Sequence, residues 1–514
     1  MRFGKSWLRA QYRHWHAFAP LVIVYIALGV LYALSTPLWQ APDEPAHYNY
    51  VRYVAENRRL PVLQMGDFPV AYLEEIKAKR FPPEMSIEPI RYESWQPPLY
   101  YVLAAGLLVP ARSLPLASQV WLLRLFSVLL GAGVIAVAYS TAREIFPNYP
   151  SLAWGTAAFA AAVPMYVATT AAISNDALAE LLVGGVLLSC VRALKRGVTA
   201  RTVVWLGLLA GLGLLAKMSV VIAVPLVMAT VWLDARRTKH ESEGQGWAFH
   251  ILLFLGVTLL VCGVWFVRNG MTYGWNDLLI WRRHGEVVQG QLTTAQYLAE
   301  NGWKRWIGAL MRVTFQSFWA QFGWMAVPVD RRIYQALWLL CVLSAVGLAL
   351  FVVRQVRRQN KAVPSNGILP DRLEPWQWEA LGLLGLLLVF SLFSYLWYNA
   401  RFVQFQGRYL FTALVPLGLA FALGLAELVG GGHERELAAL LGFAALLALA
   451  LRLVMGWPDK WCLLLLAGGF VALLFRRVFG SGCERFLFAS VYLALLVFTA
   501  VCPALFIVPY LAPA

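Results

Sequence analysis

The amino-acid sequence predicts an all-α polytopic membrane protein with about thirteen transmembrane helices. The chain has 514 residues, of which 60% are hydrophobic and only 14% are charged. A soluble domain carries roughly 25% charged residues, so this composition excludes an ordinary globular protein. Apolar runs of about 16–23 residues recur along the chain, and runs of that length predict helices that cross a bilayer.

The net charge of +16 comes from basic residues that are divided among short segments between the apolar runs. This distribution is typical of cytoplasmic loops and does not indicate a nucleic-acid partner. The six cysteines lie in or beside apolar runs, so neither a disulfide framework nor a zinc site is predicted. The basic segment 1–17 is predicted to be cytoplasmic. The run after it is predicted to be an uncleaved first helix, because no small-residue cleavage site follows.

The alternation of loop charges sets the predicted topology. With 1–17 inside, alternate loops should be basic, and they are. The apolar run after Pro98 is short, and counting it as a full crossing would place most of the basic loops outside. It is therefore predicted to lie in the membrane interface or to dip into it. Segment 202–233 is interpreted as two short helices that meet near Lys217. The predicted spans are 18–37, 119–141, 150–171, 177–194, 202–216, 218–233, 249–267, 333–354, 377–397, 409–428, 436–455, 459–475 and 486–508.

This topology assigns two long loops, 38–118 and 268–332, to the outer face. The second loop is rich in Trp, Arg and Tyr, which favours helices in the headgroup layer. A sugar-binding platform is the alternative interpretation. The same face also receives the turn 173–176, Lys217 and residues 398–408.

A polar stretch directly after the first span contains the first candidate catalytic residues. Asp43 and Glu44 are adjacent carboxylates, His47 follows them, and Pro42 and Pro45 disfavour a continuous helix. Acidic residues at a membrane face contribute nothing to spanning, so they indicate a chemical role. A solvated loop is the alternative.

Ten polar residues gather on the predicted outer face. A carboxylate there could act as a general base, several could share a hard divalent cation, and the basic groups suit phosphate oxygens. The alternatives are a helix-capping pair at 175–176, interface anchors among the basic residues, and a structural histidine. The ten residues are Asp43, Glu44, His47, Asn175, Asp176, Lys217, Arg268, Asn269, Arg401 and Arg408.

An ordered set of motifs resembles a known family. The set comprises Asp43-Glu44, Gln96-Pro97-Pro98-Leu99-Tyr100, Arg124 at the head of a span and Asn175-Asp176 at the start of another. It is similar to the GT-C superfamily of integral-membrane glycosyltransferases, and most of all to bacterial relatives of protein mannosyltransferases and of the lipid A aminoarabinose transferase. The resemblance implies a GT-C-like catalytic module over 18–420, with outer loops 38–118 and 268–332, followed by C-terminal transmembrane helices over 421–514.

The family resemblance also implies an activity. Such enzymes move a sugar, hexosyl or pentosyl, from a polyprenyl-phosphate donor to a hydroxyl of a lipid, glycan or protein, with inversion. The expected location is the bacterial plasma membrane, with the active site facing outside. Asp43 would be the base, Glu44 would position the acceptor or a metal, and Asp176 would be the second acid.

The resemblance assigns the remaining candidates to donor, substrate or metal. Donor phosphate binding is expected from Arg124, Lys217, Arg268 and Arg408. Substrate contacts are expected from His47, Gln96, Asn175, Tyr100 and Arg401. Asp43, Glu44 and Asp176 would hold a divalent cation, Mg²⁺ or Mn²⁺, if the enzyme uses one.

The sequence departs from the superfamily pattern in two places. Gln96 stands where a His or similar residue usually precedes the paired prolines. No soluble domain follows the last span, so acceptor recognition is expected from the two outer loops or a partner. The rival functions are a transporter or flippase of lipid-linked sugars, an O-antigen-ligase-like enzyme with a diphosphate-linked donor, and a scaffold.

Overall fold

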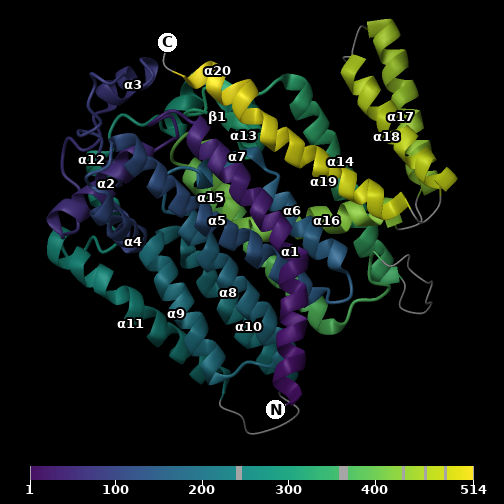
Figure 1. The fold of residues 1–514 in the computed structure, drawn as a ribbon, viewed down its shortest axis with the longest axis horizontal. Coiled ribbons are helices and arrows are strands. Elements are labelled where there is room, and N and C mark those ends of the chain that lie inside the picture. Colours follow the sequence, from purple (N-terminus) through teal and green to yellow (C-terminus); the bar gives the residue numbers. More distant parts are fainter. Residues whose placement is uncertain are drawn as a thin grey trace.

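The computed structural model describes residues 2–238, 246–357, 368–430, 434–455, 460–479 and 483–512. In these ranges the chain is an all-α bundle with one short antiparallel strand pair, β1 (Gln321–Phe322) and β2 (Val327–Pro328) (Figure 1). The longer α-helices are α1 (Arg2–Ser35), α2 (Glu44–Asn57), α4 (Leu99–Leu108), α5 (Leu116–Ile145), α6 (Pro150–Ala161), α8 (Asp176–Arg196), α9 (Ala200–Ala216), α10 (Ala223–Thr238), α11 (Trp247–Tyr273), α13 (Thr294–Trp319), α14 (Arg331–Arg357), α15 (Pro375–Asn399), α16 (Leu414–Gly430), α17 (Glu434–Met455), α18 (Lys460–Phe479) and α19 (Glu484–Cys502). Shorter helical segments are α3 (Val70–Ala78), η1 (Tyr92–Trp95), η2 (Val109–Ala111), α7 (Pro164–Thr170), η3 (Met218–Ile222), α12 (Trp281–Val287), η4 (Gly407–Ala413), a π-helical turn (Pro503–Ile507) and α20 (Val508–Leu511).

The predicted multi-pass, all-α architecture is confirmed. Nine helices in the described ranges are long and apolar enough to cross a membrane, or ten if the bent pair α6–α7 forms one span. Each predicted span overlaps a helix in the described ranges, but α9, α17 and α18 are not among the nine. The count of thirteen therefore stays a prediction.

Two breaks in the helices have local causes in the sequence. The expected span 150–171 is bent by 65° between α6 and α7. Pro164 lacks a backbone N–H, and the residue before it, Val163, adopts an extended conformation (φ −87°, ψ 107°). The predicted junction near Lys217 is confirmed, because α9 ends at Ala216 and Lys217 is extended before η3 begins.

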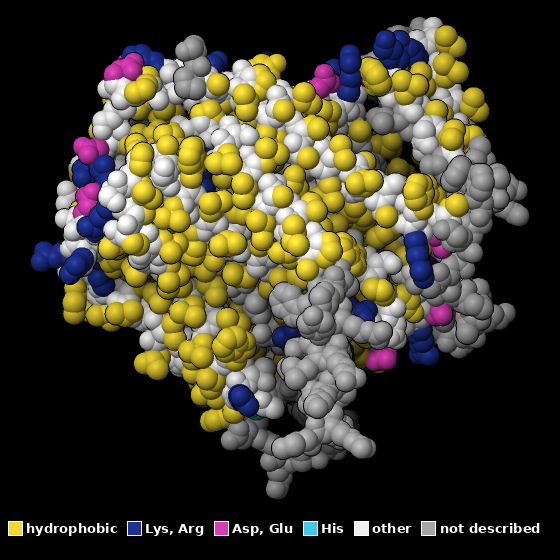
Figure 2. Space-filling model, viewed as in Figure 1, with side chains coloured by type: hydrophobic (Ala, Val, Ile, Leu, Met, Phe, Trp, Pro, Cys, Tyr) yellow, Lys and Arg dark blue, Asp and Glu magenta, His cyan; other side chains and the backbone are white. Residues whose placement is uncertain are grey.

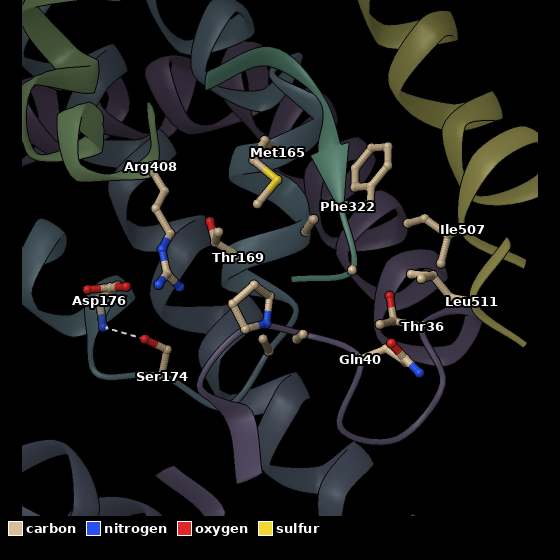
Figure 3. Close-up of a pocket in the computed structure, with 15 residues that line it drawn as sticks. Thr36, Gln40, Met165, Thr169, Ser174, Asp176, Phe322, Arg408, Ile507 and Leu511 are labelled. Atoms are coloured by element: carbon tan, nitrogen blue, oxygen red, sulfur yellow. Dashed lines mark hydrogen bonds between the residues drawn. The ribbon is translucent and has the colours of Figure 1, made fainter. Parts of the chain in front are cut away.

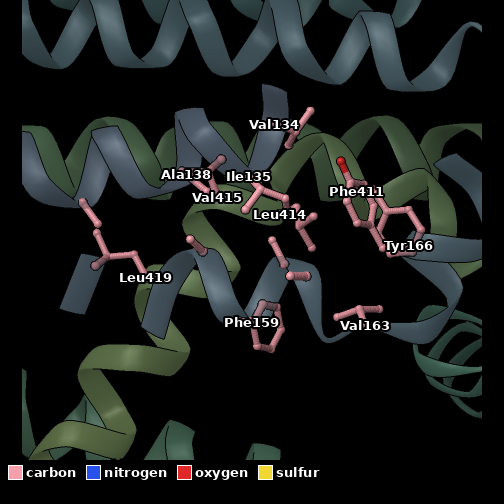
Figure 4. Packing of buried hydrophobic residues seen from close by; sticks show 14 of the residues in the cluster. Val134, Ile135, Ala138, Phe159, Val163, Tyr166, Phe411, Leu414, Val415 and Leu419 are labelled. Carbon is pink, nitrogen blue, oxygen red and sulfur yellow. The ribbon is translucent and has the colours of Figure 1, made fainter. Parts of the chain in front are cut away.

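The bundle is apolar both inside and outside. Hydrophobic side chains cover most of the face shown in Figure 2, and Leu260 on α11 is 82% exposed. Inside, Phe159 of α6, Ile135 of α5 and Leu419 of α16 belong to one buried cluster (Figure 4). A surface of this kind suits hydrocarbon chains as its solvent.

Small residues allow close packing between α14 and α16. A Cβ added to Gly424 would lie 1.9 Å from the carbonyl oxygen of Ser344, so the position admits no side chain. Interfaces between membrane helices are rich in such residues because the backbones must approach closely.

A second buried cluster holds the long segment between α1 and α5. Tyr50 of α2 stacks on Tyr101 of α4 with ring centroids 3.7 Å apart, and Trp39 packs at 5.1 Å from Tyr48. This core fixes α2 against α4, and α2 begins directly after Asp43. The segment is therefore a folded scaffold for the first candidate residues.

Candidate active site

A buried ion pair anchors the loop that carries Asp43. Both oxygens of Glu44 accept hydrogen bonds of 2.7 Å from Arg124, and both side chains are fully buried. Arg124 also donates to the carbonyl oxygens of Ala33 and Thr36, at 2.7 and 2.6 Å. Since charge-assisted bonds of this length are strong, Arg124 fastens the end of α1 to α2 and α5.

The carboxylate of Glu44 also accepts hydrogen bonds from two backbone N–H groups. It accepts the N–H of Trp39 and the N–H of Ile173, each at 3.2 Å. Ile173 lies just before the turn that carries Asp176. The buried Glu44–Arg124 pair therefore holds the segment of Asp43 and the segment of Asp176 together. The predicted roles of Arg124 in phosphate binding and of Glu44 in metal or acceptor binding do not fit, because their polar atoms are already bonded within the protein.

The backbone at Asp43 adopts a left-handed conformation (φ 66°, ψ −7°). A non-glycine residue reaches this region at a cost, and it stays there when the surroundings hold it. The hydroxyl of Tyr92 donates to Asp43 Oδ1 at 2.7 Å, and Arg408 donates to Oδ2. Burial would raise the pKa of Asp43, but Arg408 outweighs it and holds this pKa below its usual value.

Asp176 begins α8 and forms an ion pair with Lys217. The preceding residue, Asn175, is fully buried and donates to the carbonyl oxygen of Ala216 at 2.9 Å. That bond ties the turn to the end of α9, where Lys217 follows. Asn175 makes no side-chain capping bond to α8, so a simple capping pair is not what the structure shows.

Arg408 connects the two acidic segments. It bonds to Asp43 and interacts electrostatically with Asp176. A pocket opens between these segments, lined at one end by Pro42, Ser174, Asp176 and Arg408. Figure 3 shows Arg408, Asp176 and Ser174 at this end, and Phe322, Ile507 and Leu511 at the other. One end of the pocket is therefore charged, and at the other end the apolar side chains of Phe322, Ile507 and Leu511 lie beside the uncharged polar residues Thr36 and Gln40.

Two hydrogen-bond donors at the pocket are left without a partner among the described residues. They are Nε of Arg408 and Nε2 of Gln40, both on residues that line the pocket. An unpaired buried donor is costly, so each calls for an acceptor that a ligand can supply.

Three predicted substrate contacts lie near the pocket but are bonded to the protein. Nδ1 of His47 is 2.8 Å from the hydroxyl of Tyr101, and Tyr100 bonds to Ser127 at 2.8 Å. Gln96 accepts a 3.3 Å bond from Asn175. Burial lowers the pKa of His47 to about 4 against the opposing effects of Asp43 and Asp176, so its ring is neutral at pH 7.

Two predicted arginines lie away from the pocket lining. Arg268 donates to the carbonyl oxygen of Pro61 at 2.6 Å and packs over Trp265. Arg401 is exposed and lies over the ring of Trp397. Neither contributes to the pocket, so the predicted phosphate role of Arg268 and substrate role of Arg401 are not supported by the geometry. Asn269 bonds to the carbonyl oxygen of Leu278.

The proposed metal ligands do not form a shared cation site. Asp43 pairs with Arg408, Asp176 with Lys217, and Glu44 with Arg124. Within the described ranges, no group of three or more His, Cys, Asp or Glu side chains could hold a metal ion. This donor set does not fit a divalent cation.

Sequence reasoning missed three residues of this site: Gln40, Tyr92 and Glu93. Tyr92 and Glu93 lie four and three residues before Gln96 of the Gln96-Pro97-Pro98 motif, and that proximity was the available signal. Burial and the charge of Asp43 raise the pKa of Glu93 to about 7.

Solved structures are similar to this chain in fold at low sequence identity. ArnT from Cupriavidus metallidurans bound to undecaprenyl phosphate has 14% identity and a TM-score of 0.48, over 94% of this chain and 77% of that one. The archaeal oligosaccharyltransferase AglB from Archaeoglobus fulgidus, in complex with an inhibitory peptide and a dolichol-phosphate, has 12% identity and a TM-score of 0.46, over 96% of this chain and 56% of that one. These similarities are too distant to carry an argument about activity.

The sequence itself matches a family model. No curated protein matches this chain. The model described as "Predicted membrane protein (DUF2142)" matches residues 86–418, which is more than half of the 514 residues and includes Arg124, Asp176, Lys217 and Arg408. The chain therefore belongs to this DUF2142 family of membrane proteins.

Proposed function

We propose that this protein is a GT-C-like glycosyltransferase that moves a sugar from a polyprenyl-phosphate donor to a hydroxyl acceptor on the outer face of the plasma membrane. One observation carries the proposal. Asp176 and Arg408, from segments far apart in sequence, line one end of a pocket, and each is ion-paired to a further candidate residue, Lys217 and Asp43 respectively, while Phe322, Ile507 and Leu511 form an apolar wall at the other end. This is the polarity of a phosphate on a hydrocarbon chain.

Arg408 and Lys217 are the groups that would bind the donor phosphate. Arg408 offers a fork of donors, and its Nε has no partner among the described residues. When the phosphate enters, Arg408 turns from Asp43 toward the phosphate oxygens, which frees Asp43 to face the acceptor. The first isoprene units would contact the apolar wall, which Phe322, Ile507 and Leu511 form.

The transfer itself is a displacement at the anomeric carbon. The acceptor hydroxyl forms a bond to this carbon while the bond to the phosphate oxygen breaks, and the electron pair stays on the phosphate. Fixed cations stabilise the negative charge that grows on the leaving phosphate. Asp43, as base, takes the proton of the attacking hydroxyl, and attack opposite the leaving group inverts the configuration.

Mass spectrometry of cell-envelope glycans from a deletion strain tests this function. The strain should lack a glycan modification that the wild-type gene restores. Asp43→Asn should restore none of it, although the protein is made and inserted. The matched control is Asp330→Asn, an exposed acid beside β2, which should restore it fully.

Two results would count against the proposal. Full restoration by Asp43→Asn would remove the base assignment. Unchanged glycans in the deletion strain, together with lipid-linked sugar retained on the inner leaflet, would favour the rival function of a transporter or flippase.

A further inference from the structure

We propose that Ser317 of α13 is a positioning residue for donor binding, which acts through Gly407 to hold Arg408 in place at the pocket. This proposal rests on the proposed function and deepens it. Arg408 lines the pocket and pairs with Asp43, and its side chain has to leave Asp43 when it binds the donor phosphate. Because that side chain moves during binding, its position has to be fixed through the backbone from which it extends.

The backbone directly before Arg408 is bound to the last turn of α13. The N–H of Gly407 donates to the hydroxyl oxygen of Ser317 at 2.8 Å, and this hydroxyl donates in turn to the carbonyl oxygen of Val313 at 2.6 Å. Ser317 is fully buried. An unpaired buried N–H is costly, so the hydroxyl of Ser317 ties the backbone of Gly407 to one place on α13.

The close approach of Gly407 to α13 leaves no room for a side chain. A Cβ at this position would lie 2.5 Å from Cα of Phe318, and closer still to the backbone nitrogen of Phe318 and the carbonyl oxygen of Thr314. These are backbone atoms of a helix, so they cannot turn aside as a side chain would. Any larger residue would therefore push the start of η4, and Arg408 with it, away from α13.

The first turn of α13 holds the same segment farther upstream. The backbone N–H of Thr294 donates to the carbonyl oxygen of Arg401 at 2.9 Å, and its hydroxyl donates to the carbonyl oxygen of Asn399 at 2.7 Å. Both ends of α13 therefore bind residues 399–407, which lead to Arg408. The segment keeps its register on the helix when the side chain of Arg408 moves.

Arg408 depends on this support more than Arg124 does. The guanidinium of Arg124 donates to backbone carbonyl oxygens as well as to its carboxylate partner, so it is fixed directly. The guanidinium of Arg408 pairs with Asp43, and its Nε has no partner among the described residues. A binding group works well only when it is held to within about 0.5 Å of its place. For Arg408 that precision comes from Gly407 and Ser317.

Titration of the purified full-length protein with undecaprenyl phosphate tests the proposal. Ser317→Ala leaves the N–H of Gly407 without its acceptor and should weaken binding about tenfold, because the displaced Arg408 loses charge-assisted hydrogen bonds to the phosphate. Gly407→Ala should weaken binding further, because its Cβ meets the backbone of α13. If Gly407→Ala does not fold, Ser317→Ala decides alone.

A double-mutant cycle tests whether Ser317 acts through Arg408. In the Arg408→Met background, Ser317→Ala should change the affinity for undecaprenyl phosphate by less than about twofold, since the group that it positions is gone. A merely structural role would give the same fold-change in both backgrounds.

Ser391→Ala is the matched control. Ser391 of α15 is buried and accepts a 3.2 Å hydrogen bond from Thr412, near the other end of η4. Its loss should lower the unfolding temperature and leave the affinity for undecaprenyl phosphate unchanged, because the bond does not hold the backbone next to Arg408.

The outcomes separate this proposal from the proposed function. Wild-type affinity in Ser317→Ala, with binding weakened in Arg408→Met, would overturn the role of Ser317 alone. Equal losses in the two backgrounds, or an equal loss in Ser391→Ala, would also overturn it, because the effect would then be a general loosening of η4. Wild-type affinity in Arg408→Met would overturn both proposals, since Arg408 would not bind the phosphate.

Discussion

Asp43 and Glu44 are adjacent in the sequence and each forms an ion pair with an arginine, but the two pairs differ in burial. The Glu44–Arg124 side chains are 0% exposed, whereas those of Asp43 and Arg408 are 24% and 11% exposed. Arg124 also donates to backbone carbonyl oxygens, whereas Arg408 lines the pocket and its Nε has no partner among the described residues. Burial, rather than residue type, therefore separates the architectural pair from the pair to which we assign the reaction.

The largest expected difference between the pairs is in stability. Glu44→Gln leaves the charge of Arg124 buried without a carboxylate and should lower the free energy of unfolding by about 3–5 kcal/mol. Asp43→Asn should lower it much less, because both partners reach solvent. Thermal unfolding of the detergent-solubilised variants measures this. Equal losses of stability in the two variants would contradict the claim that the Glu44–Arg124 pair stabilises the fold more than the Asp43–Arg408 pair.

The next effect concerns phosphate binding. Arg408→Lys removes the planar fork and should weaken binding of undecaprenyl phosphate about tenfold, because hydrogen bonds to charged groups are lost. Its unfolding temperature should stay near that of the wild type. Arg124→Lys should show the reverse pattern, with lower stability and unchanged affinity in the protein that remains folded. Titration with the lipid, monitored by intrinsic tryptophan fluorescence, gives the affinities.

A smaller effect is expected in the pH dependence of stability. A carboxyl group whose folded pKa is depressed contributes stability above its unfolded pKa and loses that contribution as pH falls through the folded value. The Asp43–Arg408 pair should therefore stabilise the protein at neutral pH and lose this effect below about pH 3.8. Wild type and Asp43→Asn should converge in unfolding temperature as the pH is lowered. A gap that stays constant down to pH 3 would contradict the depressed pKa.

Cysteine labelling at two exposed positions tests which side of the membrane each face of the protein occupies. Glu88 and Arg196 are both exposed, with side chains 66% and 67% accessible. In a background without accessible native cysteines, Glu88→Cys should react with a membrane-impermeant reagent in intact cells. Arg196→Cys should react only after the membrane is opened. The opposite pattern would put the pocket on the cytoplasmic side.

The fold was largely predictable because a bilayer leaves a long apolar run few options besides a helix. The break at Lys217 followed from length and charge parity. The 65° bend at Pro164 was missed, because the apolar run continues through it and hydropathy does not register a lost backbone donor.

The site was predictable in part. Asp43, Asp176, Lys217 and Arg408 were predicted, and the structure brings them together. The choice among the arginines was not predictable, because Arg124 and Arg408 both lie at the head of an apolar span and differ in what surrounds them in three dimensions. Glu93 was overlooked for a similar reason, since its environment depends on the approach of Asp43 through Tyr92.

An experimental structure of the protein with bound undecaprenyl phosphate would test the central claim most directly. The account predicts density for the phosphate within hydrogen-bonding distance of Arg408 and Lys217, with the first isoprene units against Phe322 and Leu511. Phosphate bound at Arg268 or Arg401 instead, with Arg408 still paired to Asp43, would contradict it.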